Sequence, residues 1–153
     1  MYGHPEMQDE MEEIFGETIC AYTRKQAIED GVLVDIMQDE QMSDIAKRHY
    51  KFPISCTYIA KRHYKFPISC TSSVFGIMKK AVENSEYSND YAGILHDMLW
   101  MSKVMKRQID ESTIIFRVII AGAGRQRNYD FKLQVGPGDQ GEPVITIMMP
   151  DED

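Results

Sequence analysis

The most constraining feature of this 153-residue chain is a tandem repeat of fourteen residues. Residues 44–57 read DIAKRHYKFPISCT and residues 58–71 read YIAKRHYKFPISCT, so only the first position differs. Each unit contains a proline and no regular heptad, and it is shorter than the roughly 20–50 residues of a solenoid repeat. We therefore interpret the repeat as a segment duplicated inside one domain, whose core offers one position for it.

The same reasoning predicts how each copy folds. Ser43 is placed to cap a helix that Pro53 stops, because the residue before a proline is pushed out of the helical region. The segment KFPISC should be extended in both copies, and Thr57 should cap a second short helix. We expect the extra unit to form a helix–turn addition over residues 57–65, which lies on the surface or docks onto another chain by swapping. A chain without residues 58–71 should then fold as a monomer.

The rest of the chain predicts an α+β fold. Thr23 and Gln26 form a capping-box pattern and Gly31 supplies a stop, which together define a helix over 24–30. Periodicity predicts the remaining elements. They are a short strand at 32–36, a helix at 72–82 capped by Thr71, a long helix at 90–108, and strands at 114–120, 129–135 and 144–149. We expect the N-terminal short helices and the long helix to pack on a C-terminal three-stranded antiparallel meander.

Composition bounds the class of protein. The formal charge is −7, 43% of the residues are hydrophobic, and no apolar run reaches the roughly 18 residues of a membrane span. Two of the three cysteines are copies of one another, so a disulfide framework is not expected. We expect a cytoplasmic protein with no membrane contact, in which residues 1–13 form an acidic flexible arm and residues 14–153 form a single domain with the duplication 44–57/58–71.

The positive charges gather in the repeat. Residues 45–71 carry six lysines and arginines and no acid, whereas residues 1–40 carry eleven acids against two bases. This asymmetry fits internal complementarity, and it also fits a surface for nucleic acid or for an acidic partner. Trp100 is either a buried anchor or a partner-facing residue. The candidate partner-binding residues are Trp100, Arg125, Arg127, Lys47, Arg48, Lys61 and Arg62.

Patterns for catalysis or metal binding find simpler explanations. The glycine-rich segment 121–125 lacks the Walker spacing and lies between two predicted strands, which is typical of a hairpin loop. The His49–Cys56 and His63–Cys70 pairs follow from the duplication and lack the short spacing of a zinc knuckle. His96 and Asp97 are adjacent on the long helix and point about 100° apart, so we expect Asp97 to cap or to pair across the core. We therefore assign no catalytic, cofactor-binding or metal-binding residue.

Several blocks of the chain carry a family resemblance. They are Phe15-Gly16-Glu17, Tyr22-Thr-Arg, 26–35, one copy of PISCT, the Asp97–Trp100 core, and residues 136–150 with the acidic end. In these blocks the chain resembles an uncharacterised family of small bacterial proteins carried on plasmids, phages and related mobile elements. The resemblance implies an accessory cytoplasmic protein and assigns no catalytic role to any residue.

The leading functional hypothesis is a non-enzymatic binding protein that engages a protein partner. The alternative is a nucleic-acid-associated factor that uses the basic repeat with Arg125 and Arg127 on the hairpin tip. A homo-oligomer formed through the duplicated segment is compatible with either hypothesis. An unrecognised hydrolase would require a pocket with convergent carboxylates.

Overall fold

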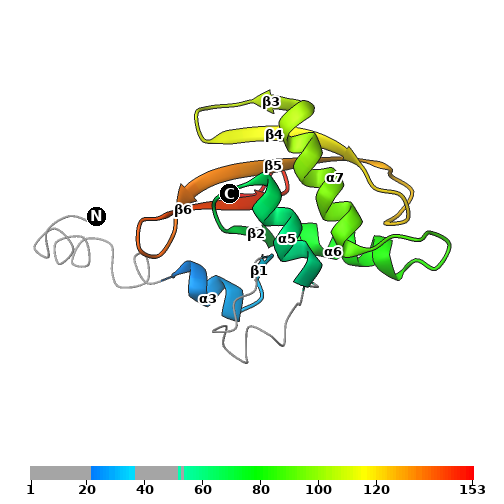
Figure 1. Ribbon diagram of the computed structural model, residues 1–153, viewed down its shortest axis with the longest axis horizontal. Coiled ribbons are helices and arrows are strands. Elements are labelled where there is room, and N and C mark those ends of the chain that lie inside the picture. Colours follow the sequence, from blue (N-terminus) through cyan, green and yellow to red (C-terminus); the bar gives the residue numbers. More distant parts are fainter. Residues whose placement is uncertain (1–21, 37–51, 53) are drawn as a thin grey trace, which may run out of the picture.

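A six-stranded mixed sheet forms the framework of the protein (Figure 1). The structure is a computed structural model that describes residues 22–36, 52 and 54–153. Its helices are α3 (Arg24–Glu29), α5 (Ile54–His63), α6 (Ser72–Glu83) and α7 (Tyr91–Val104). Its strands are β1 (Leu33–Asp35), β2 (Ile68–Thr71), β3 (Lys106–Gln108), β4 (Thr113–Ile119), β5 (Asn128–Pro137) and β6 (Pro143–Met148).

The strand order is β1-β2-β6-β5-β4-β3, and β2 and β6 run parallel while the other neighbours run antiparallel. The strands β4, β5 and β6 pair in sequence order as expected. The predicted three-stranded antiparallel meander is nevertheless wrong as the architecture, because three further strands extend the sheet at both sides. Of these, β1 agrees with the strand predicted at 32–36, whereas β2 and β3 have four and three residues, too few to show a period-two pattern.

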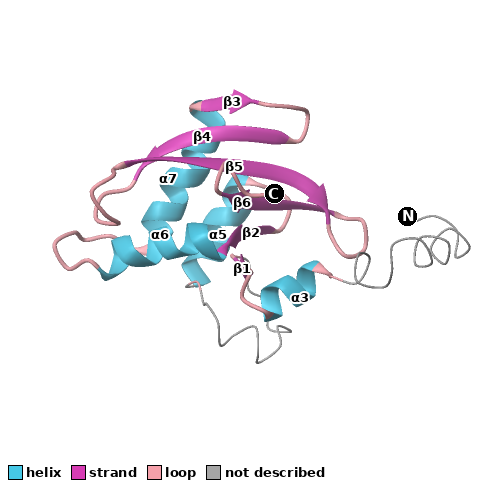
Figure 2. Ribbon diagram, turned by 180° about the vertical axis from the view of Figure 1, so that it is seen from behind, coloured by secondary structure: helices cyan, strands magenta, loops and turns pink. Residues whose placement is uncertain are grey.

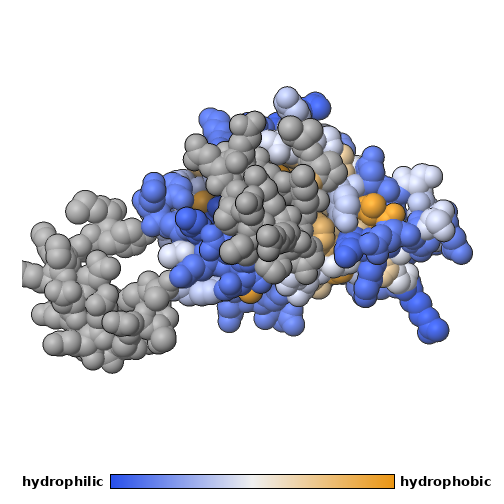
Figure 3. Space-filling model, turned by 90° about the horizontal axis from the view of Figure 1, so that it is seen from below, coloured by the Kyte–Doolittle hydropathy of each residue, from blue (hydrophilic) through white to orange (hydrophobic). Residues whose placement is uncertain are grey.

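The helices α5, α6 and α7 lie on one face of the sheet (Figures 1 and 2). Cross-strand partners such as Phe116 and Phe131 are fully or almost fully buried, with ring centroids 5.9 Å apart. Leu95, Met98 and Leu99 of α7 belong to the same buried cluster. From below, the visible described residues form a largely hydrophilic surface with small hydrophobic areas (Figure 3).

The two copies of the tetrapeptide ISCT adopt different secondary structures. In the first copy residues 54–57 begin α5, and in the second copy residues 68–71 form β2. The second copy has a strand on each side, since Cys70 lies opposite Val34 of β1 and Ile147 of β6. The position between β1 and β6 accommodates one strand, and the second copy supplies it. The first copy forms a helix instead, so the tertiary surroundings override the local propensity of the segment.

Three expectations about the repeat are therefore wrong. The first ISCT is helical and not extended, and Thr57 lies inside α5, where its hydroxyl donates to the carbonyl oxygen of Ile36 (3.4 Å). The segment 57–65 is no surface addition, because α5 packs against α7 and fully buries Cys56 and Ala60. Swapping between chains stays a prediction, and the predicted helix after Ser43 and the arm 1–13 lie outside the described residues.

Two predicted helix starts have different outcomes. The capping box of α3 is confirmed, since the Gln26 N–H donates to Thr23 Oγ1 (3.0 Å) and the Thr23 N–H donates to Gln26 Oε1 (2.9 Å). Gly31 follows with φ of 78°, as the predicted stop requires. Thr71 does occupy the N-cap position of α6, but its hydroxyl accepts no hydrogen bond from a helix N–H and instead donates to Glu152 Oε2 (2.8 Å).

The long helix α7 ends at Val104, and residues 106–108 form β3, so the predicted helical end at 108 is wrong. Among the described residues, no helix has the length and hydrophobicity needed to cross a bilayer.

Candidate functional site

An aromatic and basic surface runs along α7 and the end of α5. Four side chains of α7 are exposed and recur at helical spacings of four, three and one residues: His96, Trp100, Lys103 and Val104. Trp100 is 53% exposed, although it stands between Leu99 and Met101 in the sequence. The interpretation of Trp100 as a buried anchor is therefore wrong. We call this surface, together with Lys61, Arg62 and His63 of α5, the α5–α7 surface.

Two histidines join the helices across this surface. His63 Nε2 lies 3.4 Å from His96 Nδ1, and the His96 ring lies 6.4 Å from the Trp100 ring. The contact is a hydrogen bond only when one of the facing nitrogens is protonated and the other is not. Burial lowers the pKa of His63, and the nearby Lys103, His96 and Arg62 lower it further. The neutral imidazole is therefore favoured in the folded protein.

A chain of hydroxyl groups fixes the position of Tyr64 beside α7. The Ser102 hydroxyl donates to the carbonyl oxygen of Leu99 (2.6 Å), which leaves the Tyr64 hydroxyl to donate to Ser102 Oγ (2.7 Å). Lys103 Nζ lies 5.0 Å from the centroid of the Tyr64 ring, which is cation–π distance. The ammonium group of Lys103 is thus held next to the aromatic ring and stays exposed.

The surface has an excess of positive charge. Lys61, Arg62 and Lys103 are exposed, and none of them forms an ion pair with a residue in the described part of the chain. Asp97 is exposed on α7, so it does not pair across the core as expected. An anionic partner surface would meet several cations here and few carboxylates.

The two loop arginines lie elsewhere. Arg125 and Arg127 are exposed in the loop between β4 and β5, near the first turn of α7 (Figure 1). Arg125 lines a surface pocket of about 590 Å3 together with Lys80, Glu83 and Glu86, so two cations and two carboxylates line it.

The glycine-rich segment is confirmed as a hairpin loop. Asn89 Nδ2 donates to the Ala121 carbonyl oxygen (2.7 Å), and Asn84 Nδ2 donates to the Gly122 carbonyl oxygen (3.1 Å). Gly122 has φ of 97°, and a Cβ atom there would lie 2.9 Å from Tyr87 Cδ2. The glycines therefore serve the turn and its close packing.

The candidate residues thus divide into separate groups. Trp100, Lys61 and Arg62 belong to the α5–α7 surface, Arg125 and Arg127 lie on the loop between β4 and β5, and Lys47 and Arg48 lie outside the described residues. Sequence reasoning missed the exposed Lys103 and the contact between His63 and His96. The four-residue spacing of His96 and Trp100 is the signal that places both side chains on one helix face.

Cys56 and Cys70, the cysteines in the described part of the chain, are poor nucleophiles in this fold. Burial raises the pKa of Cys56 to about 11, and burial with the charges of Asp35 and Glu152 raises the pKa of Cys70 strongly. Within residues 22–36, 52 and 54–153, no group of three or more His, Cys, Asp or Glu side chains is arranged to hold a metal ion.

Comparison with known proteins matches the sequence of the chain to a family model. The model of a protein family described as a family of unknown function (DUF6573) matches residues 11–153. No match was found among curated proteins or among solved structures.

Proposed function

The chain belongs to a family of unknown function, DUF6573, and from its own residues we propose that it is a non-enzymatic accessory protein whose α5–α7 surface binds an acidic surface of a protein partner. On the resemblance described above, we place this role in the bacterial cytoplasm and in the service of a mobile element.

The exposure of Trp100 carries the proposal. Tryptophan and arginine are enriched among the residues that dominate binding energy at protein interfaces. A tryptophan side chain buries about 150–250 Å2, so covering the exposed half, roughly 100 Å2, would contribute about 2.5 kcal/mol. Lys103 lies three residues after Trp100 on α7, and Lys61 and Arg62 are exposed at the end of α5, so these cations outnumber the nearby carboxylate of Asp97, which supports an acidic partner over a neutral one.

Nucleic acid is the alternative partner, because aromatic rings among cations also suit bases and phosphates. It is the weaker candidate, since Arg125 lies in a pocket lined by residues of α6, of the loop after α6 and of the β4–β5 loop, none of which belongs to the α5–α7 surface.

A capture experiment tests the proposal. The full chain would be tagged and used to capture proteins from cells that carry its gene, with and without nuclease. We expect one protein to be captured independently of nuclease, and Trp100→Ala and Lys103→Ala to reduce its capture at least tenfold, since one interface hot spot is worth roughly 2 kcal/mol or more.

Two exposed residues away from this surface provide matched controls. Tyr22→Ala removes an exposed aromatic side chain next to α3, and Lys79→Ala removes an exposed cation of α6. Both should capture as well as the unchanged chain. Capture that is lost with nuclease would support the nucleic-acid alternative, and capture that is unaffected by Trp100→Ala would refute the proposed surface.

A further inference from the structure

The strand β4 extends beyond its neighbour β3. β3 pairs with residues 114–116 of β4, whereas β4 continues to Ile119. On its other side β4 is paired along its whole length with β5. Within the described part of the chain, no strand lies beside residues 117–119 on the β3 side. β3 begins at Lys106, opposite Phe116, directly after the end of α7. The edge of β4 beside residues 117–119 is therefore not covered by β3, and this leaves a notch in the edge of the sheet.

The hydrogen-bond pattern shows which backbone groups face the notch. The Ile120 N–H donates to the Arg127 carbonyl oxygen (2.9 Å), and the Val135 N–H donates to the Ser112 carbonyl oxygen (2.8 Å). In an antiparallel pair such bonds recur at every second residue, so the even-numbered residues of β4 bond to β5. The odd-numbered residues face the other side, as the bond from the Ile109 N–H to Thr113 confirms (3.0 Å). The N–H and C=O groups of Ile119 therefore point to the unoccupied edge.

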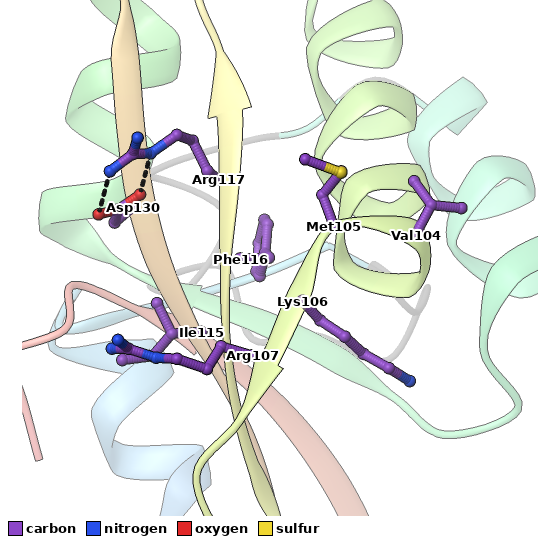
Figure 4. A pocket seen from close by; sticks show the side chains of 8 residues that line it. All are labelled: Val104, Met105, Lys106, Arg107, Ile115, Phe116, Arg117 and Asp130. Carbon is purple, nitrogen blue, oxygen red and sulfur yellow. Dashed lines mark hydrogen bonds and ion pairs between the residues drawn. The ribbon is translucent and has the colours of Figure 1, made fainter.

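The side chains around this edge are apolar and cationic. A cavity of about 400 Å3 adjoins this edge at Arg117. It is lined by Val104, Met105, Ile115 and Phe116, by Lys106, Arg107 and Arg117, and by Asp130 (Figure 4). Met105 is 61% exposed, and Ile119 at the end of β4 is 66% exposed. We call this cavity and residues 117–119 the β4 edge notch.

The charge of the notch is positive. Arg117 is paired with Asp130 through two hydrogen bonds of 2.8 and 3.2 Å (Figure 4). Lys106 and Arg107 are exposed and form no ion pair with a residue that the structure describes. The notch thus holds three cations against one carboxylate.

From these observations we propose that the β4 edge notch binds an extended acidic segment of a partner protein, which adds to the sheet as a strand beside residues 117–119. Its backbone pairs with Ile119, its apolar side chains enter the cavity, and its carboxylates lie beside Lys106 and Arg107. Edge addition of this kind takes its affinity from backbone hydrogen bonds and its specificity from alternate side chains. A second copy of this chain is a poor occupant, because pairing the same edges would place cations against cations.

The proposal goes beyond the α5–α7 surface, with which the notch shares Val104, and does not depend on binding there. The probe is a fluorescent synthetic heptapeptide that alternates glutamate with isoleucine or valine, and its binding to the full chain is measured by fluorescence anisotropy. Two control peptides carry lysine in place of glutamate, or N-methyl groups on alternate amides that block pairing along the edge. We expect the acidic peptide to bind and both controls to bind at least tenfold more weakly, the equivalent of about 1.4 kcal/mol.

One substitution isolates the backbone contact. Ile119→Pro removes the N–H that faces the notch and leaves the bonds to β5 in place, and proline is tolerated at such edge positions. It should weaken binding of the acidic peptide about tenfold, whereas Ile119→Val and Trp100→Ala should leave binding unchanged. Arg107→Glu should also weaken binding about tenfold, which keeps the test decisive if the proline variant does not fold. Equal binding of the N-methylated peptide, or no binding of the acidic peptide to the unchanged chain at millimolar concentration, would overturn the proposal.

Discussion

The two phenylalanines of the repeat should differ sharply in their contribution to stability. Phe52 of the first copy is 2% exposed, and its ring meets Phe75 and Tyr91 edge-on with centroids 5.1 and 5.6 Å apart. Phe66, at the same position of the second copy, is 39% exposed. We expect Phe52→Ala to lower the free energy of unfolding by about 3–5 kcal/mol, since it removes a buried ring and leaves a cavity. Phe66→Ala should cost about 1 kcal/mol or less.

Urea unfolding of the three proteins measures this difference. A loss of 3–5 kcal/mol is a large part of the roughly 5–15 kcal/mol that stabilises an ordinary domain, so the midpoint for Phe52→Ala should fall well below that for Phe66→Ala at an unchanged slope. In a chain of this size the melting temperature should fall by about 6–20 °C. Equal losses for both variants, or a larger loss for Phe66→Ala, would refute the assignment of the two copies to their different positions.

Three further outcomes are expected. Deleting residues 58–71 leaves one unit, whose IAKRHY can replace the second half of α5 and whose ISCT can replace β2, so the shortened chain should fold and be monomeric by light scattering; an unfolded product would contradict this. The pKa of His63 is lowered in the folded protein, so His63 takes up a proton at a higher pH in the unfolded chain than in the folded chain. The stability that is present above about pH 6.5 is therefore lost as the pH falls below that value. His63→Gln should therefore reduce the fall in unfolding free energy between about pH 7.5 and 5.5, and an unchanged fall would contradict the assignment. Cys56 and Cys70 should resist iodoacetamide at pH 8 in the folded protein and react after denaturation, as mass spectrometry would detect, because burial raises the pKa of both thiols.

Local chemistry allowed some elements to be predicted in detail. The helix α3 was predicted because its capping box and its terminal glycine are complete within nine residues, from Thr23 to Gly31. The pairing of β4, β5 and β6 was predicted because alternating residues and turn-rich loops are local signals as well. These elements need no information from the rest of the chain.

Other elements depend on partners that are distant in the sequence. The tetrapeptide ISCT is a helix at 54–57 and a strand at 68–71, so no local rule distinguishes the two copies. β2 forms because β1 and β6 leave a position between them. Residues 106–108 resemble the cationic end of a helix, yet they pair with β4 once α7 has ended.

The candidate surface was predicted only in part for a related reason. Trp100, Lys61 and Arg62 were identified by residue type, but the exposure of Trp100 depends on which face of α7 meets the sheet. The apolar neighbours Leu99 and Met101 suggested burial. The contact between His63 and His96 joins residues 33 positions apart, and it exists because α5 packs on α7.

Quenching of the Trp100 fluorescence by iodide tests the proposed binding surface most directly, because Trp100 is the only tryptophan in the chain. In the free protein, iodide should quench the emission of the half-exposed ring more efficiently than caesium, since Lys61, Arg62 and Lys103 give the α5–α7 surface an excess of positive charge. Saturation with the partner protein obtained by capture should remove most of the iodide quenching. Quenching that stays the same with and without the bound partner would contradict the claim that the α5–α7 surface is the site of binding.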